Sequence, residues 1–285
     1  MNPGGILISV NDPLSQALVE QFFGFTVLSH HQEMPFHWPE ILPDLLSGQM
    51  PRVVINAINT LDIDESEQRR EEAYLLYALS IKPLVQWCAG NGVLYVHIST
   101  SCVFSGEGNR PLAEDDLPHP VSAYGDAKLL GEEYIRRITE DHLIVRVPDV
   151  YGRGRGPLDL PFIKKESEDS LVVAGGSIVA PACAADCAAA IHTLIARGGR
   201  GICHVGPEGQ VSPREFVEWN IPMANRANNG ANGYQLREVD PREFNCPGDR
   251  PLFNVLDISR FITLSGASPR SCHDALEAYW TDGSQ

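Results

Sequence analysis

The feature that most constrains the fold is a regular alternation of short apolar, β-branched runs with helical patterns over residues 1–150. Because the apolar runs are continuous, we expect strands that are buried on both faces, as in a parallel sheet. Strand–helix alternation predicts an α/β fold, a Rossmann-like doubly wound parallel sheet with right-handed crossovers. The expected strands span 6–10, 25–28, 52–57, 93–98 and 143–147, and the expected helices span 14–23, 67–89 and 123–139, with Pro83 kinking the second helix.

The pattern changes after residue 152, where residues 152–157 read Gly-Arg-Gly-Arg-Gly-Pro and predict a flexible loop. Shorter elements follow, and the Asn-rich stretch 220–233 is expected to be a mobile loop. We therefore predict two units. A Rossmann-like, dinucleotide-binding-type domain spans 1–157 and also receives 184–206, while a smaller, irregular, substrate-binding-type lobe spans 158–183 and 207–285.

Composition excludes several classes of function. The net charge of −15 repels phosphate backbones and anionic lipid, so neither a nucleic-acid partner nor a membrane role is expected. No apolar run reaches the ~18–20 residues that cross a bilayer, and no basic region or cleavage site marks the N-terminus, so we expect a cytoplasmic protein. The seven cysteines form no CxxC motif and have no histidine at ligand spacing, which predicts reduced core thiols and no metal site.

The sharpest chemical signal is the segment that reads Tyr124-Gly-Asp-Ala-Lys128 at the start of a predicted helix. Residues four apart lie on one helical face, so the phenol and the ammonium are expected to be neighbours. A phenol has an unperturbed pKa near ~10, and a nearby ammonium lowers that pKa by favouring the phenolate. The pair can then give a proton to a carbonyl oxygen or remove one from an alcohol.

A hydroxyl-rich strand end lies where an α/β sheet places its ligands. The strand 93–98 is followed by Ser99, Thr100 and Ser101. One of these hydroxyls can share the hydrogen bond to a carbonyl oxygen with Tyr124. The alternative interpretation is that they satisfy backbone groups at the strand end.

Several segments, spread over most of the chain, carry a family signature. They are Ser-Thr-Ser-Cys-Val-Phe-Ser-Gly over 99–106, the Tyr124–Lys128 segment, Arg146 with Val-Tyr-Gly over 150–152, the Asn-Ala end of the strand 52–57, Val-Ala-Pro over 179–181, and Arg-Pro followed by Leu-Asp over 250–257. Together they resemble the extended short-chain dehydrogenase/reductases and, within them, are most similar to dTDP-4-dehydrorhamnose reductases.

The resemblance implies hydride transfer from a nicotinamide cofactor, NADP(H) or NAD(H), to the keto carbon of a nucleotide-linked sugar. It also implies a homodimer. Matched by motif, the catalytic residues are Thr100, Tyr124 and Lys128. The positions assigned to the cofactor are Val10, Asn11, Asp12, Asn56, Ala57 and Ser99, and those assigned to the substrate are Ser101, Arg146, Pro181 and Arg250. For Arg146, the alternative to a substrate contact is a structural ion pair with a carboxylate such as Asp149.

The chain departs from this family at the turn after the first strand, where the family has three spaced glycines, G-x-x-G-x-x-G. Here these positions hold Val10, Pro13 and Gln16. Glycine allows a tight turn and a close backbone approach to a pyrophosphate, and proline removes an amide donor. Asp12 is predicted to be a helix N-cap followed by Pro13 at the first helical position, and its carboxylate would repel a phosphate. The turn is therefore predicted to start a helix, with no evident provision for pyrophosphate.

The end of the second strand offers no other group that would bind the cofactor. The residues over 29–33 read Ser-His-His-Gln-Glu, with no arginine for a 2′-phosphate and no acid at the strand end for a ribose. His30 and His31 can contact a phosphate, although exposed loop histidines are the simpler interpretation.

Three hypotheses stay open at this point. The first is a reductase with an unusual dinucleotide site. The second is a catalytically silent regulatory or binding subunit, of the type of the methionine adenosyltransferase β subunit, which acts on a protein partner. The third is a non-redox acid/base enzyme that uses the Tyr–Lys pair without nicotinamide. Only the first requires a bound cofactor.

Overall fold

The computed structural model describes residues 4–9, 11–29, 50–167, 170–227, 234–244 and 246–281. The predictions made for Val10, His30 and His31 lie outside the described residues, as do residues 228–233 of the Asn-rich stretch. The earlier part of that stretch was expected to be a loop. It instead completes the helix α8 (Pro213–Ala227).

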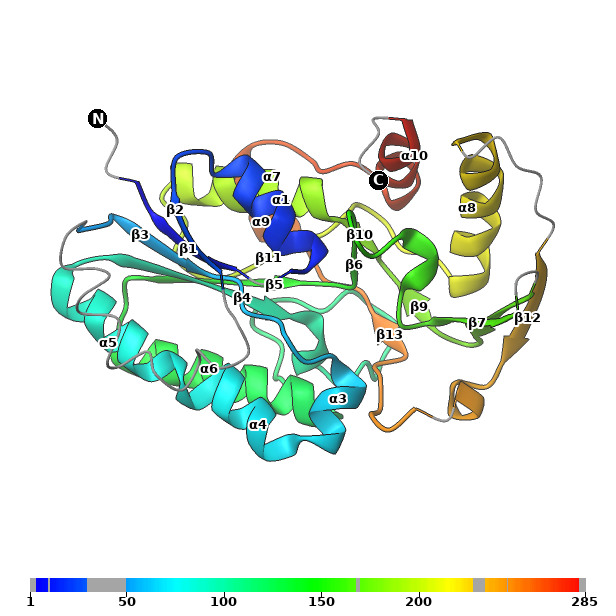
Figure 1. Ribbon diagram of the computed structural model, residues 1–285, viewed down its shortest axis with the longest axis horizontal. Coiled ribbons are helices and arrows are strands. Elements are labelled where there is room, and N and C mark those ends of the chain that lie inside the picture. The colour runs from blue at the N-terminus through cyan, green and yellow to red at the C-terminus, as the bar shows by residue number, and fades with distance from the viewer. Residues whose placement is uncertain are drawn as a thin grey trace.

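Within the described residues, six strands form the central sheet in the order β11–β5–β4–β3–β1–β2 (Figure 1). Every neighbouring pair runs parallel, which confirms the predicted Rossmann-like doubly wound fold. The bounds are β1 (Ile6–Ser9), β2 (Thr26–Ser29), β3 (Val53–Asn56), β4 (Leu94–Thr100), β5 (His142–Val147) and β11 (Gly201–His204).

Helices cover both faces of this sheet (Figure 1). One layer holds α1 (Pro13–Gln21), α7 (Ala184–Ala196) and α9 (Ser259–Ser265), and the opposite layer holds α4 (Arg70–Tyr74), α5 (Ile81–Asn91) and α6 (Ala123–Ile138). Successive residues of a strand point to opposite faces. In β1, accordingly, Leu7 packs into the core under α1 and α7, while Ile8 packs into the core over α5 and α6. Burial on both faces explains the continuous apolar strands.

The segment between β3 and β4 differs from the single kinked helix that was expected over 67–89. It consists of α3 (Ile63–Gln68), α4, a π-helical segment η1 (Leu75–Leu79) and α5. Pro83 lies in the first turn of α5, which follows η1 directly. The wide turn of η1 turns Tyr77 inward, where its hydroxyl donates to the carbonyl oxygen of Leu61 at 2.6 Å.

A smaller lobe stands at one end of the sheet (Figure 1). It contains a three-stranded sheet in the order β12–β8–β7, together with α8 and α10 (Cys272–Thr281), and Phe216, Leu276 and Val173 belong to its core. The strand bounds are β7 (Ile163–Ser167), β8 (Ser170–Ala174) and β12 (Gln235–Val239). One element departs from the expected division at residue 207: Phe261 of α9 packs into the core of the large sheet.

Short elements lie between the sheet and the lobe (Figure 1). Two parallel pairs join β6 (Val150–Tyr151) to β10 (Ala182–Cys183) and β9 (Ile178–Val179) to β13 (Phe253–Asn254). The 3-10 turns are η2 (Ser101–Val103), η3 (Pro157–Asp159) and η4 (Pro241–Phe244). None of the helices in the described ranges combines the length and the apolar character that a bilayer-spanning segment needs.

Candidate active site

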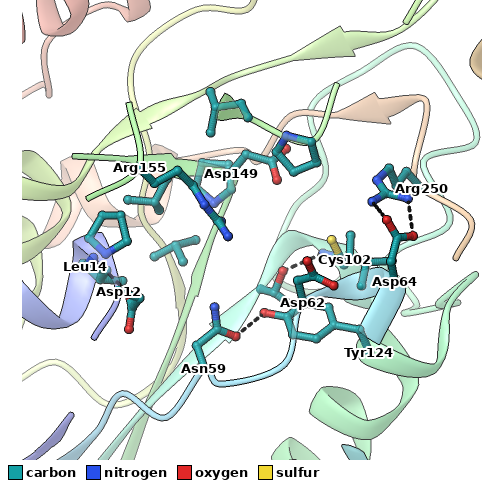
Figure 2. Close-up of a pocket in the computed structure, with 18 of the residues that line it drawn as sticks. Asp12, Leu14, Asn59, Asp62, Asp64, Cys102, Tyr124, Asp149, Arg155 and Arg250 are labelled. Carbon is teal, nitrogen blue, oxygen red and sulfur yellow. Dashed lines mark hydrogen bonds and ion pairs between the residues drawn. The ribbon is translucent and has the colours of Figure 1, made fainter. Parts of the chain in front are cut away.

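A cavity of about 440 Å³ opens at the carboxyl ends of β1, β3, β4 and β5. This is the edge where parallel α/β sheets bind their ligands. Figure 2 shows Asp12 and Leu14 at one end of the cavity, and Tyr124, Asp64 and Arg250 at the other. We call these the α1 end and the Tyr124 end.

Helix α6 brings Tyr124 and Lys128 to the cavity. It begins after Ser122, whose hydroxyl oxygen accepts a hydrogen bond from the N–H of Gly125 at 3.2 Å. Gly125 permits a close approach of α6 to η2, because a Cβ there would lie 2.1 Å from the carbonyl oxygen of Cys102. The spacing of four then places the phenol and the ammonium on one flank of α6, as the sequence predicted.

The Tyr124 hydroxyl donates to Oδ1 of Asn59 at 2.8 Å (Figure 2). Burial raises the pKa of this phenol well above its usual value, and a hydrogen bond with Thr100 opposes that rise. A pKa lowered by the neighbouring ammonium was expected from the sequence, and this expectation was wrong. Desolvation exceeds the effect of the charge. Tyr124 is therefore a protonated phenol at neutral pH.

Lys128 is 2% exposed and donates to the carbonyl oxygens of Ile58 at 3.0 Å and Ile98 at 3.3 Å. An ammonium carries three N–H donors, and the third meets no hydrogen-bond acceptor among the described residues, although Nζ lies 4.4 Å from the centroid of the Tyr77 ring. Burial lowers the pKa of Lys128 to about 8, although the charges of Asp12 and Glu132 act in the opposite direction. Lys128 remains mostly charged at neutral pH, and its ammonium lies on the cavity wall.

The three strand-end hydroxyls have different roles. The Thr100 hydroxyl oxygen accepts from the N–H of Cys102 at 3.1 Å, and Thr100 lies on the cavity wall beside Tyr124. The Ser99 hydroxyl donates to Oε1 of Glu132 at 2.5 Å. The Ser101 hydroxyl is buried, has no hydrogen-bond partner in the described part of the chain, and lies off the cavity wall. Of the three hydroxyls, that of Thr100 is therefore the one that lies beside Tyr124.

Arg146 does not reach the cavity, contrary to its expected substrate role. It lies within β5, is 1% exposed, and donates to Glu132 at 3.0 Å and 2.6 Å. The alternative of a structural ion pair fits this geometry, but the partner is Glu132 on α6 and not Asp149. A charge this deeply buried needs such a bidentate partner, which the neighbouring helix supplies.

The turn after β1 is built as a helix start. One Asp12 carboxylate oxygen accepts from the N–H of Leu14 at 3.0 Å and of Ser15 at 3.2 Å, and the other accepts from the Ser15 hydroxyl at 2.6 Å. Pro13 occupies the first helical position, as expected. Burial raises the pKa of Asp12, while these hydrogen bonds lower it. Asn11 is exposed, and its side-chain oxygen accepts from the Gln16 amide at 2.9 Å.

The other expected ligand-binding positions are divided between the cavity wall and the interior. Ala57 lies on the wall, whereas Asn56 is buried and donates to the Tyr95 hydroxyl at 2.9 Å, so that it holds the strand end in place. Arg250 lies on the wall and donates to both carboxylate oxygens of Asp64 at 3.0 Å and 2.8 Å. Pro181 is buried in the connection between β9 and β10 and lies off the wall.

Asn59 and Arg155 are two of the wall residues that were given no role from the sequence. Asn59 follows β3 by three residues, and only the folded chain shows that its side chain meets Tyr124. Arg155 belongs to the glycine-rich loop after β6, and Figure 2 shows its side chain pointing into the cavity. Within the described part of the chain, Arg155 forms no ion pair. The position of Asn59 after a strand end could have indicated a site residue. Nothing in the sequence distinguishes Arg155 from the neighbouring Arg153.

A second cavity of about 670 Å³ adjoins the first and extends towards the smaller lobe. The two share several wall residues, among them Cys102, Asp149 and Arg250. The second cavity is lined largely by residues of the segments 174–179, 240–244 and 246–254. The two cavities thus lie side by side, the first reaching from α1 to Tyr124 and the second from there towards the lobe.

Comparison with known proteins gives consistent findings. The family model described as the RmlD substrate binding domain matches residues 8–284. The spore coat polysaccharide biosynthesis protein SpsK of Bacillus subtilis is 33% identical over 230 residues, which cover 80% of this chain and 78% of SpsK. The dTDP-4-dehydrorhamnose reductase of Escherichia coli is 27% identical over 232 residues, covering 79% of this chain and 78% of that enzyme.

Solved structures agree with the fold. The dTDP-4-dehydrorhamnose reductase of Clostridium acetobutylicum superposes with a TM-score of 0.81 at 25% identity, covering 96% of this chain and 98% of that one. The same enzyme from Bacillus anthracis, solved in complex with NADP, gives a TM-score of 0.85 at 21% identity over 99% of this chain and 100% of that one. The extent of the family match and of the SpsK alignment shows that the chain belongs to the family described as the RmlD substrate binding domain.

Proposed function

We propose that the protein is a reductase that converts a keto group of a nucleotide-linked sugar, or of a related metabolite, with hydride from NADPH. The observation that carries this proposal is the convergence of Tyr124, Lys128 and Thr100 on one cavity at the carboxyl edge of the sheet. The names of the relatives and the NADP complex of the Bacillus anthracis enzyme support the same activity.

The residues at the Tyr124 end fit the reactive part of a nicotinamide cofactor. Two Lys128 N–H groups bind carbonyl oxygens, and the third, which meets no acceptor among the described residues, suits a ribose hydroxyl. Asn59 and Thr100 add polar groups to the same wall. When bound, the cofactor supplies the hydride that reduces the keto carbon.

Tyr124 is the proton donor in this proposal. Its raised pKa keeps the phenol protonated, so it can protonate the oxygen of the reduced carbonyl. The Lys128 ammonium stabilises the phenolate that this transfer leaves behind. The Thr100 hydroxyl donates a hydrogen bond to the same oxygen as negative charge develops on it. Asn59 is a positioning residue, because it accepts the Tyr124 hydrogen bond that must be released for the transfer.

The second cavity is the place proposed for the substrate's remaining groups. Arg250 stands at the junction of the two cavities, and its Nε has no hydrogen-bond partner in the part of the chain that the structure describes. Its other nitrogens bind Asp64, so the Arg250–Asp64 pair forms part of the wall where the two cavities meet. A cytoplasmic location and a homodimer remain predictions, which cell fractionation and light scattering would check.

The proposed function is tested by NADPH oxidation with a panel of nucleotide-linked keto sugars. We expect Tyr124→Phe to lose ~10²-fold or more in kcat while NADPH binding persists, since only the proton donor is removed. The matched control is Tyr74→Phe, because the Tyr74 hydroxyl bonds Asp126 outside the cavity. Full activity in Tyr124→Phe would contradict the assigned role. Absence of NADPH and NADH binding at millimolar concentration would favour the regulatory or non-redox hypotheses.

A further inference from the structure

Helix α1 begins at the cavity. Its N-terminal N–H groups, which have no partner within the helix, already bind a side chain. The N–H groups of Leu14 and Ser15 donate to the Asp12 carboxylate at 3.0 Å and 3.2 Å. Pro13 has no N–H to offer. The start of α1 therefore presents a carboxylate to the cavity wall, in place of unpaired amides.

This position matters because the first helix of a dinucleotide-binding sheet normally directs its N-terminal amides at a diphosphate. An anion already bound there uses the same donors and adds like-charge repulsion. The Asp12 carboxylate is held firmly, since the Ser15 hydroxyl also donates to it at 2.6 Å. Pro13 in turn packs near Gly152, where an added Cβ would lie 3.1 Å from the Pro13 Cβ. The turn is thus closely packed.

We propose that the Asp12 carboxylate is an internal anion that competes with the diphosphate of the dinucleotide for the start of α1, and so sets the cofactor affinity of this protein. This inference rests on the proposed function, because it concerns the cofactor of the same cavity. Asp12 then weakens cofactor binding, and removal of its charge strengthens the binding of NADPH.

Two substitutions separate the charge of Asp12 from its capping. In Asp12→Asn the side-chain oxygen still caps the helix, so the fold is kept and only the charge is lost. Asp12→Gly removes both the charge and the acceptor, which releases the N–H groups of Leu14 and Ser15 for a ligand. Asp62→Asn is the matched control. Asp62 also caps a helix and lines the same cavity, but it lies at α3, where its oxygen accepts from the N–H of Glu65 at 2.8 Å.

The measurement is the affinity of each purified full-length variant for NADPH, from fluorescence titration at fixed salt. We expect Asp12→Asn to bind NADPH about tenfold more tightly than the wild type, and Asp12→Gly about 30-fold more tightly. Asp62→Asn should change the affinity less than about threefold. Dihydronicotinamide riboside, which has no phosphate, should bind all four proteins equally, because it meets only the Tyr124 end.

The outcomes distinguish this inference from the proposed function. NADPH binding by the wild type that neither Asp12 variant strengthens would overturn the inference and leave the reductase intact. An equal gain for the riboside in Asp12→Asn would also overturn it, because Asp12 would then act through the Tyr124 end. If none of the proteins, Asp12→Gly included, bound NADPH or the riboside, both the inference and the proposed function would fail.

Discussion

The two ends of the cavity differ in what their sequences are built to do. At the Tyr124 end, a buried lysine, a protonated phenol and a hydroxyl meet on one wall, an arrangement that costs stability and serves chemistry. At the α1 end, Asp12 and Pro13 form a favourable helix start, which adds stability and hinders an anionic ligand. The comparison teaches that the reactive part of a site can be kept while its cofactor-anchoring part changes.

The largest effect expected at the Tyr124 end comes from Lys128→Met. We expect kcat to fall ~10²-fold or more, because the phenolate loses its stabilising charge. The melting temperature should move by less than about 5 °C, since relief from a buried charge offsets the two hydrogen bonds lost from Nζ. Steady-state kinetics and thermal unfolding check both parts. The control is Lys82→Met, whose ammonium lies over the Tyr134 ring, 3.6 Å from its centroid, away from the cavity wall. Retained activity in Lys128→Met would show that the Tyr124 end does not depend on this charge for the reaction, and would contradict the comparison of the two ends.

The next effect is a fall in rate at alkaline pH. Lys128 has a pKa of about 8, so its charged fraction decreases as pH rises, while Tyr124 stays protonated because its own pKa is raised. The rate of carbonyl reduction should therefore decline about fivefold between about pH 8 and pH 9. The residual rate of Lys128→Met should not show this decline. Equal pH profiles for the two proteins would assign the titration to another group.

The same pKa predicts how stability depends on pH. The native state releases the Lys128 proton near pH 8, whereas the unfolded chain holds it up to about 10.5. The unfolded state therefore binds more protons between these values, and this group makes the protein more stable as pH rises through them. Urea unfolding of wild type and Lys128→Met over that range isolates the contribution, which should be missing from the variant. The same slope in both proteins would contradict it.

A smaller effect is expected at the α1 end from Arg155→Gln. The guanidinium points into the cavity, where it offers a cation to an anionic cofactor group (Figure 2). Its loss should weaken NADPH binding by about three- to tenfold. Arg153→Gln is the matched control in the same loop, because Arg153 pairs with Glu20 outside the cavity. Equal affinities in these two variants would show that Arg155 does not contribute.

The smallest effect concerns the stability of the α1 end. Asp12→Ala removes the N-cap acceptor and should lower the free energy of unfolding by about 1 kcal/mol. Asp12→Asn keeps the acceptor, so its free energy of unfolding should fall by only a few tenths of a kcal/mol. Urea denaturation of both variants compares them directly. Equal losses would show that the charge, and not the hydrogen bonds, makes Asp12 a good start for α1.

Local patterns explain which features could be predicted from the sequence. The parallel strands follow from continuous apolar runs, the start of α1 follows from Asp12 and Pro13, and the shared flank follows from the spacing of Tyr124 and Lys128. Each of these depends on neighbouring residues or on helical and strand periodicity.

Features that depend on tertiary packing were missed. The partner of Arg146 is Glu132, which meets it only because α6 packs on β5. The contact between Asn59 and Tyr124 joins residues 65 positions apart. The raised pKa of Tyr124 results from burial, which no local pattern measures. The segment 67–89 breaks at Arg69, which has a non-helical backbone between α3 and α4.

Following the hydride shows whether Tyr124, Lys128 and Thr100 carry out carbonyl reduction in this cavity. The wild-type protein is incubated with NADPH deuterated at C4 and with a nucleotide-linked 4-keto sugar, and the product is analysed by mass spectrometry and NMR. We expect one deuterium on the former keto carbon, at a rate that Tyr124→Phe lowers ~10²-fold. Formation of a product that contains no deuterium, with either face of the cofactor labelled, would contradict it.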